Sequence, residues 1–272
     1  MAANRLRIVP LPSSLAPHGP LFRNLVRREV RQRYKGSILG LAWTLINPLL
    51  VVGAYWVVFR FLFGTPIPNY ALFLFVGLMV WTLFFGGLTV GATSLIQNAA
   101  LVTKVRFPRA IVPAAAIAGN GVIAVAMLVI ALPLCIWQGN GSLLPLLALP
   151  GFLLLTLMLT LGMGMLLGAV NVYFRDVQHI IEAIGVPWFF LTPIFYSYGT
   201  LPETAQQYPL VIDILHWGNP ISPFVICVQD ILFYGQWPPV ADAVYCVVAA
   251  VVVLAIGWFV FQRLEGEMAV EL

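Results

Sequence analysis

The sequence predicts an all-α integral membrane protein with six transmembrane helices. Of its 272 residues, 61% are hydrophobic and only 9% are charged, and the mean hydropathy is +0.96. Most of such a chain cannot present a polar face to water. A helix needs roughly 20 mainly apolar residues to cross a hydrocarbon core of about 30 Å. Six segments meet this requirement, with expected limits 38–62, 70–96, 111–137, 145–171, 179–198 and 239–262.

A cationic, amphipathic segment precedes the first of these spans. An apolar residue recurs every four positions, at Phe22, Val26, Val30 and Tyr34. Arg and Lys fill most of the other positions, which favours a short helix lying in the membrane interface. A simple positive anchor beside the membrane explains the same pattern. We therefore expect a cytoplasmic N-terminus with an interfacial helix, a transmembrane domain and a cytoplasmic tail, at 1–37, 38–262 and 263–272.

The last third of the chain is less regular than the rest. The expected fifth span is short and contains Pro187 and Pro193, which suggests a broken or tilted helix. Segment 199–238 is too polar and too rich in proline for a continuous span, although its second half has helical apolar spacing. We therefore expect outer re-entrant helices between spans five and six.

Basic residues are distributed unevenly between the two sides of the membrane. With six spans, all of the 14 Lys and Arg residues except Arg60 fall on one side. Because Lys and Arg concentrate in loops that remain in the cytoplasm, both termini are expected to be cytoplasmic. Arg60 lies close to the end of a span, so it either reaches the outer interface or faces a wet interior.

The sequence offers no pattern typical of an enzyme. The aspartates are isolated, and the three histidines lack the spacing of zinc ligands. Ion-coupled transport places ionisable residues inside the spans, whereas the middles of these spans are essentially free of them. A P-loop requires Gly-x-x-x-x-Gly-Lys followed by Ser or Thr, and neither Lys35 nor Lys104 ends such a loop. If ATP drives this protein, another chain must bind it.

Several sequence motifs occur together and in a fixed order. They are REVRQRYKGSILGLAWTLINP at the first span, VRFPR after span two, NVYFRDV after span four, and LTPIFYSYGTLPE followed by NPISPF around the outer segment. In combination they resemble the membrane subunit of bacterial ABC exporters of polysaccharides, the family of O-antigen, capsule and teichoic acid export permeases. The resemblance covers residues from about 20 to 262.

The resemblance implies six spans per subunit, a homodimer with the conduit between the protomers, and two copies of a separate nucleotide-binding ATPase subunit. It implies a lipid-linked glycan as the substrate and the bacterial cytoplasmic (inner) membrane as the location of this multi-pass protein. ATP and Mg²⁺ would be bound by the partner, with no cofactor on this chain and no nucleic acid partner. Contacts with membrane lipids are expected as well.

The expected function is therefore that of a transport subunit and not of an enzyme. It would translocate a lipid-linked polysaccharide outward while the partner ATPase hydrolyses ATP. A drug or antibiotic efflux permease of the same ABC class would have a similar topology and is the nearest alternative. An ion-coupled secondary transporter is a more distant alternative.

Two groups of residues on the expected cytoplasmic side are candidate contacts. The resemblance implies that one group contacts the ATPase: Lys104, Val105, Arg106, Phe107, Arg109, Arg175 and Asp176. Adjacent residues do not face each other on a helix, so the last two are not expected to pair. By charge and location, a second group could hold a lipid headgroup or a pyrophosphate: Arg27, Arg28, Arg31, Arg33 and Lys35.

The conduit is expected to offer aromatic rings and few ionised groups, because sugar chains expose hydroxyls and apolar C–H faces. Eight residues are candidates for its lining: Trp43, Tyr55, Arg60, Trp81, Phe84, Phe85, Trp188 and Phe195. Trp and Tyr are also typical of membrane interfaces, and Phe fills contacts between helices. We therefore expect only about a third of the aromatic residues to line a path.

Overall fold

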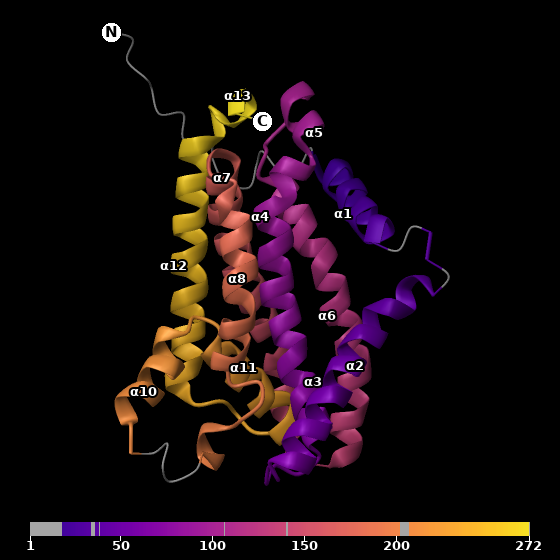
Figure 1. Ribbon diagram of the computed structural model, residues 1–272, viewed down its shortest axis with the longest axis vertical. Coiled ribbons are helices and arrows are strands. Elements are labelled where there is room, and N and C mark those ends of the chain that lie inside the picture. The colour runs from indigo at the N-terminus through magenta and orange to yellow at the C-terminus, as the bar shows by residue number, and fades with distance from the viewer. Residues whose placement is uncertain are drawn as a thin grey trace.

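Helices are the main secondary structure in the computed structural model of the chain. The residues that it describes are 18–33, 36–37, 39–105, 107–139, 141–201 and 207–271, and no strand occurs in these ranges. The long helices lie side by side in one bundle (Figure 1). Within the described ranges, five helices are long and apolar enough to cross a membrane, and a sixth crossing results if one bent pair is counted as a span. The predicted all-helical membrane fold is confirmed.

Five stretches form the long crossings. The first two are α2 (Trp43–Trp56) with η4 (Val57–Leu62), and α3 (Tyr70–Trp81) with η5 (Thr82–Gly86) and α4 (Gly87–Gln97). The others are α6 (Ile111–Gln138), η6 (Leu144–Ala148) with α7 (Leu149–Tyr173), and α12 (Val240–Glu265). These bounds lie close to five of the predicted spans, and α12 continues past the predicted limit at 262.

Short elements mark the two ends of the bundle. Figure 1 shows α1 (Gly19–Arg33), α5 (Ala99–Lys104) and α13 (Met268–Glu271) at one end. The other end carries η7 (Tyr198–Thr200), α10 (Pro209–Asp213) and η8 (Ile214–Gly218), and η3 (Gly40–Ala42) precedes α2. The first end holds most of the basic residues, so we call it the basic face: Arg23, Arg27, Arg28, Arg31, Arg33, Lys104, Arg109, Arg175 and Arg263.

The predicted fifth span, 179–198, differs from the observed helix. Helix α8 (Asp176–Leu191) has 16 residues, fewer than the roughly 20 needed for a straight crossing. It continues through Pro187 and stops at Thr192, whose backbone is extended at φ −91° and ψ 140°. Thr192 precedes Pro193, whose ring disfavours the helical backbone in the residue before it. The prediction was wrong in extending this helix to 198, because Pro193 sets its end.

A bent pair of short helices follows α8. Helix α10 continues into η8, and after a short break α11 (Ser222–Gln229) continues into η9 (Asp230–Tyr234). The two halves are bent by 87°, as in a broken span or a re-entrant loop. We call this segment, 209–234, the outer hairpin. Its position agrees with the predicted re-entrant helices, and its depth in the membrane stays a prediction.

Polar side chains tie the outer hairpin to the helices before and after it. At the bend, Asn219 Oδ1 accepts a hydrogen bond from Trp188 Nε1 at 2.8 Å, and Asn219 Nδ2 donates to Thr192 Oγ1 at 3.0 Å. His216 Nε2 contacts a carboxylate oxygen of Asp242 in the first turn of α12. The outer hairpin is therefore fixed to both α8 and α12.

The second span forms the centre of the bundle, and the first lies at its periphery. Of the most apolar window in each span, 72% is buried in the second and 11% in the first. Phe73, Met79, Phe84 and Leu88 are fully buried in the second span. The exposed apolar side chains of the first span are available to lipid or to another subunit.

Two glycines allow α7 and α12 to cross closely. A Cβ added to Gly162 would lie 2.6 Å from Leu254 Cα, and one added to Gly257 would lie 2.7 Å from the carbonyl carbon of Gly162. Small residues at a crossing let two backbones approach, which is a main source of helix association in lipid. This crossing positions the last turn of α12 at the basic face.

Candidate functional site on the basic face

Helix α1 packs on α6 through its apolar stripe. Leu25 is buried in a cluster with Ile111 and Ala115 of α6. Farther along, Glu29 lies over Gly119, where an added Cβ would come within 3.0 Å of the Glu29 Cβ. The missing side chain at Gly119 therefore makes room for α1. The predicted amphipathic helix is present, and part of its apolar face packs on protein.

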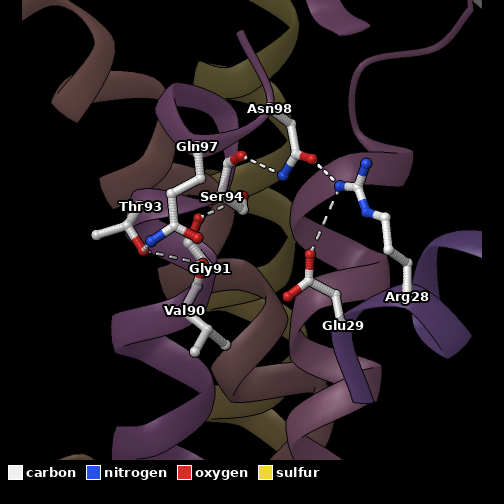
Figure 2. A network of polar contacts seen from close by, with 8 residues as sticks. All are labelled: Arg28, Glu29, Val90, Gly91, Thr93, Ser94, Gln97 and Asn98. Atoms are coloured by element: carbon white, nitrogen blue, oxygen red, sulfur yellow. Dashed lines mark hydrogen bonds and ion pairs between the residues drawn. The ribbon is translucent and has the colours of Figure 1, made fainter. Parts of the chain in front are cut away.

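Arg28 connects α1 to the end of the second span (Figure 2). Its Nη2 donates a hydrogen bond to Asn98 Oδ1, and the same nitrogen lies 3.8 Å from Glu29 Oε1. Asn98 Nδ2 donates to the Ser94 carbonyl oxygen at 2.8 Å, and the Ser94 hydroxyl donates to the Gly91 carbonyl oxygen at 2.8 Å. A series of hydrogen bonds thus runs from α1 into α4, and Arg28 is engaged within the protein.

Arg33 makes a second connection of this kind, to spans three and two. Its Nη1 donates to Asn120 Oδ1 at 3.0 Å, and Asn120 Nδ2 donates to the Thr82 carbonyl oxygen at 2.9 Å. Thr82 begins the π-helical turn η5, where the regular α-helical hydrogen-bond pattern is interrupted. Asn120 is only 2% exposed, and a buried amide is costly unless it is hydrogen-bonded. One side chain therefore joins Arg33 to the π-helical turn.

The other described cations of this predicted group face an open cavity on α1. Its volume is about 430 Å³, and it is lined by Asn24, Arg27, Arg28, Arg31 and Gln32. Arg27 and Arg31 are exposed and lie one helical turn apart, on the same side of the helix. None of these lining residues is acidic, so the cavity presents N–H donors suited to phosphate oxygens. Lys35, the fifth residue of the group, lies outside the described residues.

The loop between α5 and α6 is tied to the end of the last span. The backbone N–H of Arg109 donates to Glu265 Oε1 at 2.9 Å, and Arg109 Nη1 donates to the backbone oxygen of Glu265. Lys104 and Val105 are exposed at the end of α5, and Arg106 lies outside the described residues. A cavity of about 400 Å³ opens at this junction, and its lining is Val102, Thr103, Val105, Phe107, Arg109, Glu265 and Gly266.

Arg175 lies between α7 and α8, Asp176 begins α8, and both residues are exposed. Among the described residues no ion pair joins them, as expected for adjacent positions. Beside them, the Tyr173 hydroxyl donates to the Leu264 carbonyl oxygen at 3.0 Å. The loop after α5 and the end of α7, which adjoin the two parts of the predicted ATPase-contact group, therefore both bond to the last turn of α12.

Replacing Glu265 by Ala should loosen the loop between α5 and α6. The Arg109 amide would lose its side-chain acceptor, at a cost of about 1 to 2 kcal/mol. Opening of this loop would rise about tenfold, and trypsin should cleave after Arg109 correspondingly faster. Glu267→Ala is the control, because the Glu267 side chain makes no hydrogen bond to a described residue. Equal cleavage of the two variants would contradict the assigned contact.

Four of the aromatic candidates form one cluster. Trp81 stacks on Phe85 with ring centroids 4.8 Å apart, and Trp188 meets Phe84 edge-on at 5.3 Å. Phe84 is fully buried and Trp81 is 8% exposed, whereas Phe85 and Trp188 are half-buried. Phe84 and Trp81 thus pack inside the protomer, and Phe85 and Trp188 are the accessible rings of this cluster.

The remaining conduit candidates lie on or near the first span. Tyr55 is half-buried and packs edge-on against Phe195, which is itself buried, at 4.8 Å. Trp43 is exposed at the start of α2. Arg60 is exposed near the end of this span, and its Nη1 donates to the Thr65 carbonyl oxygen. Whether any of these residues lines a conduit stays a prediction.

The long apolar helices define a multi-pass membrane protein, and exposed cations beside two open cavities lie at one end of its bundle. The chain belongs to the ABC-2 type transporter family, whose model matches residues 20–233. The match begins at α1 and reaches the outer hairpin, so it includes both groups of candidate contacts.

Curated relatives agree with this family. The chain is 31% identical to the O-antigen export system permease protein RfbA of Myxococcus xanthus over 263 residues, which cover 96% of this chain and 99% of the relative. Two proteins of the same name from Klebsiella pneumoniae are 28% and 31% identical. These matches cover 80% and 73% of this chain, and 83% and 80% of the respective relatives.

Sequence reasoning missed three residues that organise the basic face: Asn98, Asn120 and Glu265. Asn120 did carry a signal, because an amide in the middle of an apolar span requires a partner. Glu265 carried none, since its partner Arg109 is 156 positions away in the sequence.

Proposed function

We propose that this chain is the transmembrane subunit of an ATP-driven exporter that moves a lipid-linked cell-envelope polysaccharide outward across the bacterial cytoplasmic membrane. The observation that carries the proposal is the similarity to O-antigen export permeases over almost the whole of both chains. The family match to ABC-2 type transporters agrees with it. The resulting topology would place the basic face and both termini in the cytoplasm.

The energy source in this proposal is a separate ATPase subunit, present in two copies beneath a homodimer of this chain. ATP and Mg²⁺ would bind to that partner. The cavity between the loop after α5 and the end of α12 would receive a partner side chain, beside the exposed Lys104 and Val105. Arg109 and Tyr173 both form hydrogen bonds to the last turn of α12. A displacement of the loop after α5 or of the loop after α7 would therefore be transmitted to α12.

The cavity on α1 is the proposed contact for the anionic group that links the glycan to its lipid. Arg27 and Arg31 would supply most of the binding, since Arg28 and Arg33 already have partners inside the protein. Paired guanidinium groups bind phosphate oxygens through several charge-assisted hydrogen bonds. The accessible rings of the aromatic cluster, Phe85 and Trp188, together with Trp43, would give sugars a surface on which to slide.

Replacing both Arg27 and Arg31 by Gln should lower export about tenfold or more, because two charge-assisted contacts to phosphate are lost. The measurement is surface glycan in cells that lack the native permease gene and carry each variant. Arg23→Gln combined with Arg263→Gln is the control, since it removes the same charge from residues outside the cavity. Unchanged export in the Arg27 and Arg31 variant would refute this role.

A second readout separates the headgroup contact from the exporter assignment itself. The wild type and the double variant are purified in mild detergent and analysed for a bound ATPase subunit and its ATP hydrolysis. Equal amounts of the ATPase on both proteins, with export lost only in the variant, would support both parts of the proposal. A wild-type chain that binds no ATPase and exports no glycan would overturn the function.

A further inference from the structure

A large cavity lies at the end of the bundle opposite the basic face. Its volume is about 790 Å³, and it lies between the ends of α2 with η4, α3 and α6. Figure 1 shows α2, α3 and α6 converging at this end. The walls are mainly apolar, with Leu49, Val52, Phe75, Ile130 and Leu134. A cavity of this size is in the range that binds a small amphiphilic molecule.

Two donor side chains, Arg60 and Gln138, lie in the polar part of this cavity. Arg60 has five N–H donors, and within the described residues only its bond from Nη1 to the Thr65 carbonyl oxygen is present. Gln138 also lines the cavity, and its Nε2 is buried without a hydrogen-bond partner in the described part of the chain. A buried amide donor without an acceptor is costly. An acceptor that enters the cavity would satisfy the Gln138 amide, and the Arg60 guanidinium lines the same cavity.

The start of α3 adds positive potential at the same place. Asn69, which has φ 47°, precedes the helix without a side-chain cap, and it lines the cavity together with Tyr70 and Ala71. The N-terminus of a helix carries a partial positive charge. None of the lining residues is acidic. The polar part of the cavity thus favours an anion.

The apolar part of the cavity indicates that this anion belongs to a lipid. Leu49 and Leu134 are more than 40% exposed, so the cavity opens sideways where acyl chains surround the bundle. Trp56 and Trp137 also line it, and Trp137 is 86% exposed near the end of α6. Exposed Trp near the end of a span is typical of the headgroup region. The cavity therefore offers a cationic part for a lipid headgroup and an apolar part for its acyl chains.

We propose that this cavity binds an anionic glycerophospholipid of the surrounding bilayer, with its phosphate at Arg60 and Gln138 and an acyl chain along Leu49, Ile130 and Leu134. A zwitterionic headgroup fits less well, because its ammonium group would lie near Arg60 with no carboxylate to pair with it. The proposal goes beyond the proposed export function and does not depend on it, since the lipid comes from the bilayer and is not transported.

Native mass spectrometry of the full chain tests the proposal. The protein is released from nanodiscs that contain an equimolar mixture of phosphatidylglycerol and phosphatidylethanolamine. The wild type should retain phosphatidylglycerol preferentially. Arg60→Gln should reduce this retention about tenfold, and Gln138→Leu about fivefold, because each removes a donor to the phosphate. Arg263→Gln, which removes a cation at the basic face, should retain lipid as the wild type does.

Several results would overturn the lipid site. These are equal retention of the two lipids, unchanged retention in the Arg60 and Gln138 variants, or an equal loss in the Arg263 control. Displacement of phosphatidylglycerol by a polyprenyl phosphate added at the same concentration would show that the carrier lipid, not a bilayer lipid, is the occupant. Thermal unfolding of each variant checks that the fold is intact, and the two variants at separate positions keep the test informative if one of them fails to fold.

Discussion

Replacing Gly257 by Val is expected to prevent stable folding of the bundle. The new side chain would point into the backbone of Gly162, and its Cβ alone would lie 2.7 Å from the Gly162 carbonyl carbon. Backbone atoms on the facing helix cannot rotate away as a flexible side chain can, so α7 and α12 would have to separate. We expect a loss of at least about 3 kcal/mol in the free energy of unfolding. Equilibrium unfolding in mixed micelles of rising SDS content measures it.

Gly151→Val is the matched control for this effect. Gly151 is on α7, as Gly162 is, and a Cβ at position 151 would meet nothing within 4 Å. The same change of residue should therefore cost little there, since Val has a somewhat higher helix propensity than Gly. If both variants were equally stable, the close crossing of α7 and α12 would not be a main source of stability.

The second large effect is expected for Asn120→Leu. This change leaves the Thr82 carbonyl oxygen without its donor and the Arg33 guanidinium without its acceptor, both inside the protein. Leu would also press against Gly86, because a Cβ at Gly86 would lie 3.1 Å from the Asn120 amide. The combined cost in the free energy of unfolding should be about 2 to 4 kcal/mol. The same SDS titration measures the loss.

Asn120→Asp separates the two hydrogen bonds. The carboxylate keeps an acceptor for Arg33 but cannot donate to the Thr82 carbonyl oxygen, so this variant should be less destabilised than Asn120→Leu. A double-mutant cycle with Arg33→Gln gives the coupling between Arg33 and Asn120, which we expect to be about 1 to 2 kcal/mol. A coupling near zero would mean that α1 and the π-helical turn are independent.

The long helices could be predicted because their apolar runs exceed the length of a membrane crossing. The predicted spans 70–96 and 111–137 differ by only one residue at their ends from the observed stretches, Tyr70–Gln97 and Ile111–Gln138. Composition could not locate the end of α8, since two prolines competed for it and a single proline can be accommodated inside a helix. The fold class thus followed from hydropathy. The end of α8 depended on which proline the helix accommodates, and it accommodates Pro187 but not Pro193.

The candidate site could be predicted only in part. Charge identified the cations on α1, but it could not distinguish the exposed Arg27 from Arg28, whose partner Asn98 lies 70 positions away. Helical periodicity orients a residue relative to its own helix, and neighbours from other spans decide whether it is buried. The same limit applies to the aromatic candidates, because Phe84 and Phe85 are adjacent in sequence and only Phe84 is fully buried.

The ties of the outer hairpin also constrain the order in which the chain can mature during synthesis. Asn219 bonds to residues that are made earlier, Trp188 and Thr192, whereas His216 contacts Asp242, which is made later. The outer hairpin can therefore form its hydrogen bonds to Trp188 and Thr192 once residue 219 has been synthesised. Its contact with Asp242 cannot form before α12 has been synthesised. Closure of this end of the bundle is thus a late event that follows insertion of the final helix.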